Sequence, residues 1–144
     1  MDNVHYYNTT VKWTEGRKGE LIEPTMPTIE VATPPEFPKG VPNTWSPEHL
    51  YVASANICLM TTFLAIAENS KLDFKTFECD GVGKLEIVDG RFMISEIVLK
   101  PKVVVAEEKD IERAQRIVEK AENHCLISNS MKTEIKLEMN VVVE

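Results

Sequence analysis

The run EHLYVASANICLMTTFLAIAENS, residues 48–70, constrains the fold of this chain more than any other segment. Ser46 and Pro47 precede it, and a hydroxyl N-cap followed by proline at the first helical position predicts that a helix begins there. About six turns then follow with few charges, so the helix is apolar on nearly every face and should be buried all round. A chain of 144 residues fits a single domain, 1–144. We therefore expect a partner subunit to cover the helix, the alternative being a helix covered on both sides within one chain.

The residues before this helix predict a small β-meander. VHYYNTTVKW, residues 4–13, is rich in β-branched and aromatic residues and ends at a loop with two glycines, residues 14–19. Residues 20–22 and 28–31 read as two further short strands. A stiff connection over residues 32–47, with five of the eight prolines, leads to the helix.

The residues after the helix predict a hairpin, a second helix and a strand. Residues 72–105 contain two alternating runs joined by Asp89-Gly90, a strong two-residue hairpin signal. Residues 107–125 carry an apolar stripe at helical spacing and predict an amphipathic helix. Residues 131–143 alternate and should form a closing strand. The fold class is thus α+β: β-meander, long buried central helix, β-hairpin, amphipathic helix and closing strand.

Composition excludes several classes of function. The formal net charge of −7 provides no basic surface of the kind that nucleic acids require. The start, MDNVHYYNTT, has no basic region followed by an apolar one, and no apolar run approaches the roughly 18 residues that span a bilayer. We expect a cytoplasmic protein with neither nucleic acid nor membrane as a partner.

The three cysteines match no disulfide scaffold and no CxxC pattern. A metal site built from His49, His124 and the cysteines is a weak alternative, because no pair has ligand spacing. No bound metal is expected. Cysteines that matter in a reducing compartment should act as thiols or as transient disulfides.

The positions of the cysteines suggest different roles. Cys58 lies midway along the central helix, where it is either a small buried hydrophobe or a thiol that needs a cation from elsewhere in the chain. Cys125 ends the second helix beside His124, and the helix dipole there opposes thiolate formation, so it suits a resolving thiol better than a first nucleophile. Cys79 lies in a strand between two acids that raise its pKa, and we expect it to be structural.

Three motifs, TEGRKGE, SPEHLYVASANICLMTTF and HCLISNSMK, resemble the OsmC/Ohr family of osmotically inducible protein C and organic hydroperoxide resistance proteins. The resemblance spans nearly the whole chain and implies an intertwined homodimer with active sites at the subunit interface. It also implies that Cys58 attacks the peroxide, that Cys125 resolves it as an intramolecular disulfide, and that Arg17 and Glu48 organise the site. The chain departs from the family where Leu126 follows Cys125, a position at which proline is common.

The expected site has a physical constraint. Glu48 and Cys58 are separated by about 15 Å of rise on one straight helix, so we expect Glu48 to act on Cys58 of the partner subunit, across a two-fold axis. Arg17 is the expected cation, held by a bidentate contact with Glu48, and it can stabilise the thiolate and donate to a peroxide oxygen. Lys18 is its competitor.

The predicted activity is that of a cysteine-based peroxidase. An organic hydroperoxide is reduced to an alcohol, Cys58 becomes a sulfenic acid, and Cys125 condenses with it. No cofactor is bound, and an external dithiol, for example of the lipoyl type, resets the disulfide. Apolar walls from Leu59, Met60 and Phe63 would favour organic hydroperoxides over hydrogen peroxide. The alternative is a non-enzymatic OsmC-like dimer that binds a small hydrophobic ligand in the interface cleft, and it predicts that replacing Cys58 leaves function intact.

Overall fold

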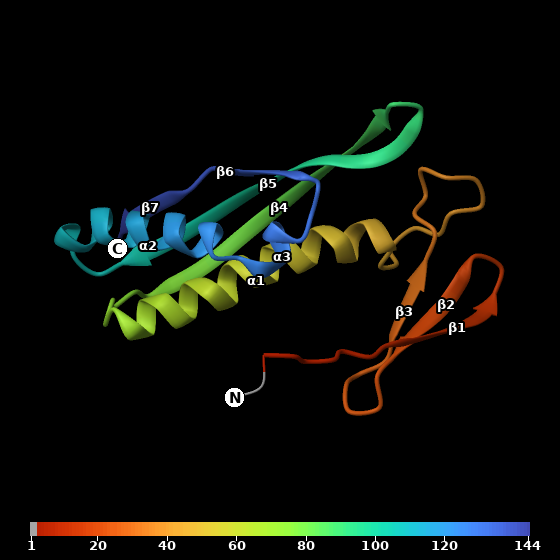
Figure 1. Ribbon diagram of the computed structural model, residues 1–144, viewed down its shortest axis with the longest axis horizontal. Helices are drawn as coiled ribbons and strands as arrows, with labels where there is room; N and C mark the ends of the chain where they lie inside the picture. Colours follow the sequence, from red (N-terminus) through yellow and green to blue (C-terminus); the bar gives the residue numbers. More distant parts are fainter. Residues whose placement is uncertain (1–2) are drawn as a thin grey trace. The chain divides into compact units, whose positions relative to one another are not determined.

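The computed structural model describes residues 3–144, which form two compact units (Figure 1). The first unit runs up to Leu50 and contains three strands and the first turn of a helix. The second, Tyr51–Glu144, contains the rest of that helix, two further α-helices and four strands. The α+β class and the order of the elements agree with the prediction from sequence.

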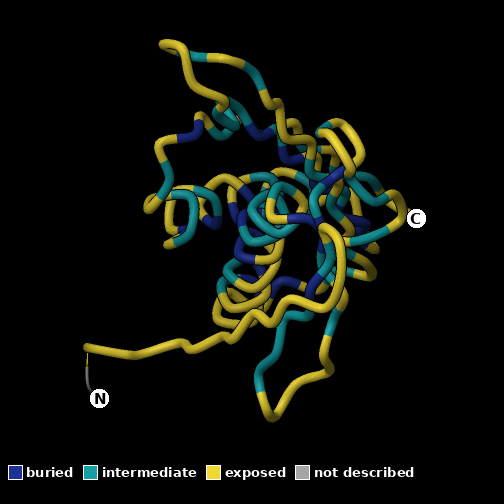
Figure 2. Tube along the Cα trace, turned by 90° about the vertical axis from the view of Figure 1, so that its right-hand side faces the viewer, coloured by how far each residue is buried: buried dark blue, intermediate teal, exposed yellow. Residues whose placement is uncertain are grey.

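The first unit is built on an antiparallel sheet of order β1-β2-β3. Its strands are β1 (Thr10–Glu15), β2 (Lys18–Ile22) and β3 (Ile29–Ala32). Pairing starts where Thr10 lies opposite Ile22, so the strand predicted from residue 4 is too long at its start. Residues 3–9, which precede β1, are all exposed (Figure 2). Gly16 permits the tight turn after β1, because its φ of 53° lies in the left-handed region.

Helix α1 (Pro47–Asn69) begins where the sequence predicts. The buried Ser46 hydroxyl accepts a hydrogen bond from the His49 backbone N–H at 3.2 Å, and His49 Nδ1 accepts one from the Ser46 backbone N–H at 3.2 Å. The pair is a reciprocal cap in which histidine replaces the more usual glutamate or glutamine. Ser46 is therefore confirmed as the N-cap, and the cap places Glu48 in the first turn.

The second unit is centred on a long hairpin of β4 (Thr76–Val88) and β5 (Arg91–Val105). Asp89 and Gly90 turn it with φ of 51° and 79°, which confirms the predicted two-residue turn. The predicted closing strand is two strands, β6 (Glu134–Leu137) and β7 (Asn140–Val143), both parallel to β5. They pair with β5 on either side of Pro101, which has no N–H to donate to a ladder.

The helix predicted over residues 107–125 is also interrupted. A 3₁₀ turn, η1 (Glu108–Asp110), leads into α2 (Ile111–Asn123), and a short helix, α3 (Leu126–Asn129), follows. Cys125 lies between α2 and α3 with extended backbone, φ −70° and ψ 108°. It is therefore not the end of the second helix but the joint between two helices.

The core of the second unit lies where α1 and α2 cover one face of β5. Alternate residues of β5 are buried, as expected for side chains that point to one side of a strand. Phe63 of α1 is completely buried, stacks on Phe77 with ring centroids 4.9 Å apart, and meets Phe74 edge-on at 5.1 Å. The other fully buried large side chains of this core are Leu59, Ile97, Leu99, Val103, Val105 and Val118.

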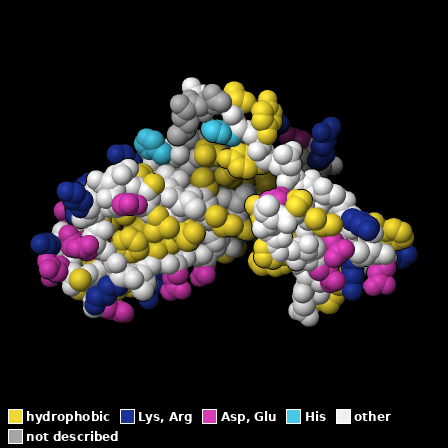
Figure 3. Space-filling model, turned by 90° about the horizontal axis from the view of Figure 1, so that it is seen from below, with side chains coloured by type: hydrophobic (Ala, Val, Ile, Leu, Met, Phe, Trp, Pro, Cys, Tyr) yellow, Lys and Arg dark blue, Asp and Glu magenta, His cyan; other side chains and the backbone are white. Residues whose placement is uncertain are grey.

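Two expectations about helix α1 are wrong: that no apolar run is long enough to span a bilayer, and the alternative that the helix is covered on both sides within one chain. Its 23 residues are long and apolar enough to cross a membrane, so the expectation that no run approaches that length is wrong. Within its unit it is buried on one face only: Leu59 and Phe63 are inaccessible, whereas Ile57 and Leu64 are 56% and 40% exposed. The chain's own second unit thus leaves an apolar strip of α1 uncovered (Figure 3).

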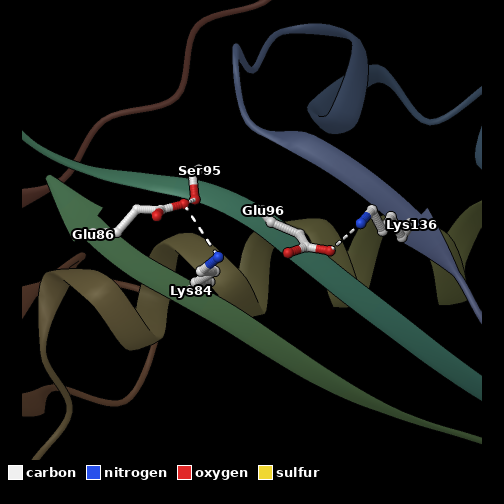
Figure 4. A network of polar contacts seen from close by, with 5 residues as sticks. All are labelled: Lys84, Glu86, Ser95, Glu96 and Lys136. Carbon is white, nitrogen blue, oxygen red and sulfur yellow. Dashed lines mark hydrogen bonds and ion pairs between the residues drawn. The ribbon is translucent and has the colours of Figure 1, made fainter. Parts of the chain in front are cut away.

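Polar side chains join three strands on the outer surface of the second unit (Figure 4). The Ser95 hydroxyl donates to Glu86, Lys84 Nζ lies 3.4 Å from Glu86, and Lys136 Nζ lies 2.7 Å from Glu96. The Ser95 hydrogen bond, helped by Lys84, lowers the pKa of Glu86. Exposed pairs of this kind contribute little stability, so the sheet depends on its buried face.

Candidate active site

Arg17 and Glu48 line one pocket of the first unit. The turn between β1 and β2 carries Arg17, and the first turn of α1 carries Glu48. The pocket has a volume of about 870 Å³, within the usual range for small-molecule sites. Its apolar lining, which the sequence did not reveal as a site, includes Val11, Trp13, Leu21, Val31, Phe37 and Leu50.

The charged groups of this pocket are not paired with each other. Lys18 Nζ lies 4.0 Å from Glu30, whereas no ion pair involves Arg17 in the described part of the chain. The expected bidentate contact between Arg17 and Glu48 is not formed. Glu48 Oε1 is buried without a hydrogen-bond partner, an arrangement that costs free energy until a donor reaches it.

Cys58 and Cys125 are neighbouring free thiols in the second unit. Cys58 is 8% exposed on α1, and Cys125 is inaccessible at the joint between α2 and α3. Burial raises the pKa of the Cys125 thiol, and the adjacent Cys58 raises it further. Cys58 Sγ lies 3.9 Å from the Thr62 hydroxyl. The fold therefore brings together two thiols that are far apart in sequence.

Cys79 has a different environment. It lies in β4, forms no disulfide, and burial raises the pKa of its thiol to about 11, with the charge of Asp80 as a lesser cause. The Cys79 carbonyl accepts a hydrogen bond from Asn56 Nδ2 of α1 at 2.9 Å. A thiol with this pKa is almost wholly protonated near neutral pH and therefore a poor nucleophile.

The structure adds Glu122 and Ser128 to the surroundings of Cys125. Glu122 Oε2 and Ser128 Oγ are buried without hydrogen-bond partners, and the Cys125 backbone N–H donates to the Glu122 carbonyl at 3.1 Å. Burial raises the pKa of the Glu122 carboxyl, and the Ser128 hydroxyl partly offsets this rise. His124, which the sequence suggested as the modulator of Cys125, is exposed, with Nδ1 2.9 Å from the Lys120 carbonyl. The sequence contains one indication that Glu122 belongs to these surroundings, which is that it precedes Cys125 by only three residues.

The apolar walls predicted beside Cys58 are only partly present. Leu59 and Phe63 are inaccessible in the core, so neither is an open wall for a substrate. Met60 is 37% exposed. An apolar pocket lies instead beside Arg17 and Glu48 in the first unit.

The α+β fold is that of an OsmC-type protein. The family model for OsmC-like proteins matches residues 40–140, and the chain belongs to this family. Among curated proteins it is similar to the uncharacterized protein YmaD of Bacillus subtilis (strain 168), with 24% identity over 97% of this chain and 95% of the relative.

Solved structures show the same fold. An OsmC-like protein from Vibrio cholerae, VCA0330, matches with a TM-score of 0.85 and 22% identity, covering 94% of this chain and 99% of that one. An organic hydroperoxide resistance protein from Elizabethkingia anophelis matches with a TM-score of 0.74 and 22% identity, covering 97% and 99% of the two chains.

The raised pKa of Glu122 predicts a stability effect with a defined sign. Because the carboxyl binds its proton more tightly in the folded state, its contribution to stability is complete below the ordinary glutamate pKa and is lost as the pH rises through the raised value. Glu122→Gln should therefore gain stability relative to the wild type on going from about pH 4 to about pH 8. Urea unfolding at both pH values measures this difference.

Glu119→Gln is the matched control, because Glu119 is an exposed acid on the same helix. Its stability relative to the wild type should change little with pH. If the difference in free energy of unfolding between Glu122→Gln and the wild type is the same at both pH values, the assigned burial of the Glu122 carboxylate is wrong.

Proposed function

We propose that the protein is a thiol-dependent peroxidase that reduces organic hydroperoxides to alcohols. The observation that carries the proposal is the pair of adjacent free thiols, Cys58 and Cys125. Membership of the OsmC-like family and similarity to proteins named organic hydroperoxide resistance proteins support it. The compartment is proposed to be the cytoplasm, where an external dithiol can reset the enzyme.

The proposed reaction has two steps in the protein. The Cys58 thiolate attacks the distal oxygen of the hydroperoxide, the O–O bond breaks, and the alkoxide takes a proton to leave as an alcohol. The Cys125 sulfur then attacks the Cys58 sulfenic acid, and the oxygen leaves as water. The dithiol reduces the resulting disulfide by two successive exchanges. No bound cofactor takes part.

The pocket in the first unit supports an organic substrate. Its apolar lining suits an alkyl group, and Arg17 supplies a permanent cation that can donate to a peroxide oxygen. We propose that Glu48, whose Oε1 lacks a partner, fixes the Arg17 guanidinium once substrate binds and acts on Cys58 of the partner subunit.

The homodimer is part of the proposal. Ile57, Met60 and Leu64 form an exposed apolar strip on α1, which a second copy of the chain would cover. An interface of this kind would be isologous, with the same surface contributed by both subunits.

The same pocket also favours a second candidate function. Its volume and apolar lining would suit a small hydrophobic ligand held without chemistry. The two candidates differ in their need for Cys58, because only the peroxidase depends on its thiol.

Oxidation by an organic hydroperoxide tests the chemistry. Wild-type protein treated with cumene hydroperoxide should form an intramolecular Cys58–Cys125 disulfide, because the two thiols are adjacent. Cys125→Ser should stop at a sulfenic or sulfinic acid on Cys58, and Cys58→Ser should remain reduced at Cys125. Intact mass and peptide mapping measure these states. Cys79→Ser is the control and should still form the disulfide, whereas thiols that stay reduced in every form would favour the ligand-binding candidate.

Arg17 and Lys18 can be separated by substitution. Arg17→Gln should slow the oxidation of Cys58 by on the order of 10²-fold, the usual cost of losing a group that stabilises developing charge. Lys18→Gln should have a much smaller effect, because Lys18 faces Glu30. Stopped-flow rates with the hydroperoxide in excess give the comparison. A larger loss in Lys18→Gln would transfer the role to the lysine.

The exposed strip of α1 predicts the oligomeric state. Ile57→Arg should convert a dimer to a monomer, because it would bury a charge without a partner in the interface. Glu112→Arg, on the exposed charged face of α2, is the control and should remain dimeric. Sedimentation velocity distinguishes the two, and a monomeric wild type would remove the dimer from the proposal.

A further inference from the structure

Two buried polar groups beside Cys125 remain without a function in the mechanism above. Glu122 Oε2 on α2 and Ser128 Oγ on α3 are both inaccessible and both lack hydrogen-bond partners. Cys125 lies between these helices, and its backbone N–H donates to the Glu122 carbonyl at 3.1 Å. Buried polar atoms without partners are uncommon and costly, so their presence beside a thiol requires an explanation.

Glu122 and Ser128 lie three residues before and three residues after Cys125, one on each of the helices that meet there. No hydrogen bond of ordinary geometry joins Ser128 Oγ to either neighbour, but its hydroxyl lies near enough to the Glu122 carboxyl and the Cys125 thiol to lower the pKa of each. Cys58 of α1 is a further neighbour of Cys125, and it raises the pKa of the Cys125 thiol. A hydroxyl can accept a proton from one neighbour while it donates to another, so Ser128 is suited to connect a thiol with a carboxylate.

We propose that Glu122 is the proton acceptor for the resolving thiol and that Ser128 relays the proton. The inference rests on the proposed peroxidase cycle and adds to it a positioning residue for the second step. Cys125 gives its proton to the Ser128 hydroxyl, which passes its own proton to the Glu122 carboxylate. The Cys125 thiolate attacks Cys58 Sγ, the S–S bond forms and the S–O bond of the sulfenic acid breaks. The departing oxygen receives the proton back and leaves as water.

The environment of Cys125 favours the presence of such a group. Burial and the neighbouring Cys58 both disfavour the Cys125 thiolate, so few molecules would hold it without a base. A carboxyl whose pKa is raised by burial is a stronger base than an exposed glutamate, which suits it to accept this proton. The other titratable group that faces Glu122 is Cys79 of β4, and no ion pair involves Glu122 among residues 3–144.

The resolving step can be measured without peroxide. An aromatic disulfide reagent, dithiobis-nitrobenzoate, forms a mixed disulfide at Cys58 and releases one coloured thiolate. Attack by Cys125 then releases the second, and the rate of this release reports the Cys125 nucleophile alone. Use of the full-length Cys79→Ser protein removes the third thiol and the titration of Cys79. After hydroperoxide treatment, the attack of Cys125 on Cys58 is followed as the loss of sulfenic acid. The relay and the peroxidase activity are thus tested in separate experiments.

Glu122→Gln and Ser128→Ala should each slow the second release at least tenfold near neutral pH and leave the first release unchanged. The wild-type rate should rise with pH at two inflections, the lower of which belongs to Glu122 and is absent in Glu122→Gln. Ser128→Thr, which keeps the hydroxyl, should retain most of the rate, and Glu119→Gln should match the wild type.

Three results would overturn the relay. They are an unchanged second release in Glu122→Gln, a decrease in Glu122→Gln by the same factor at every pH, and a Ser128→Thr protein as slow as Ser128→Ala. Unfolding curves identify any variant that is slow because it is misfolded. If Glu122→Gln is misfolded, the pH profile of the second release in Ser128→Ala decides the test instead. If hydroperoxide leaves Cys58 reduced while the relay is seen with the disulfide reagent, the peroxidase proposal fails, and only the assignment of Glu122 as the proton acceptor for Cys125 stands.

Discussion

The burial of one face of α1 against β5 and α2 is the interaction on which the second unit depends. Ala55, Leu59, Phe63 and Ala67 recur every four residues along α1 and all are inaccessible. This spacing holds the helix at a fixed rotation against the sheet. Cys58 adjoins Leu59 in sequence, so the packing that buries the core also determines the direction of its thiol. The position of the thiol is therefore a consequence of core packing.

The interruption between α2 and α3 has the complementary effect on Cys125. A continuous amphipathic helix would carry its apolar stripe past this residue, but α2 ends at Asn123 and Cys125 adopts extended backbone. The Cys125 thiol is then buried beside Cys58. A joint between two helices also moves more easily than the middle of one, which suits the proposed resolving role of Cys125.

The sequence predicted the structure correctly at positions where a few adjacent residues determine it. The Ser46 cap and the Asp89-Gly90 turn are set by a few adjacent residues, and both form as predicted. The closing strand was predicted as one because its division depends on Pro101 in another strand. The walls at Leu59 and Phe63 were misplaced for a similar reason, since a run that is apolar on every face does not show which side meets the core. Glu122 was missed because its burial depends on tertiary packing.

Burial of both thiols limits how the site can react. Burial raises the pKa of the Cys125 thiol, and neither cysteine lies at the start of a long helix, whose positive end could stabilise a thiolate. In the proposed cycle, reactivity would therefore have to come from particular side chains, a cation for Cys58 and a base for Cys125. The two requirements differ because the first proposed step ends with charge on the oxygen that leaves in the alcohol, whereas the second begins with a proton on a thiol that solvent does not reach. If both sulfurs react while buried, the group that accepts the second proton must be buried with them.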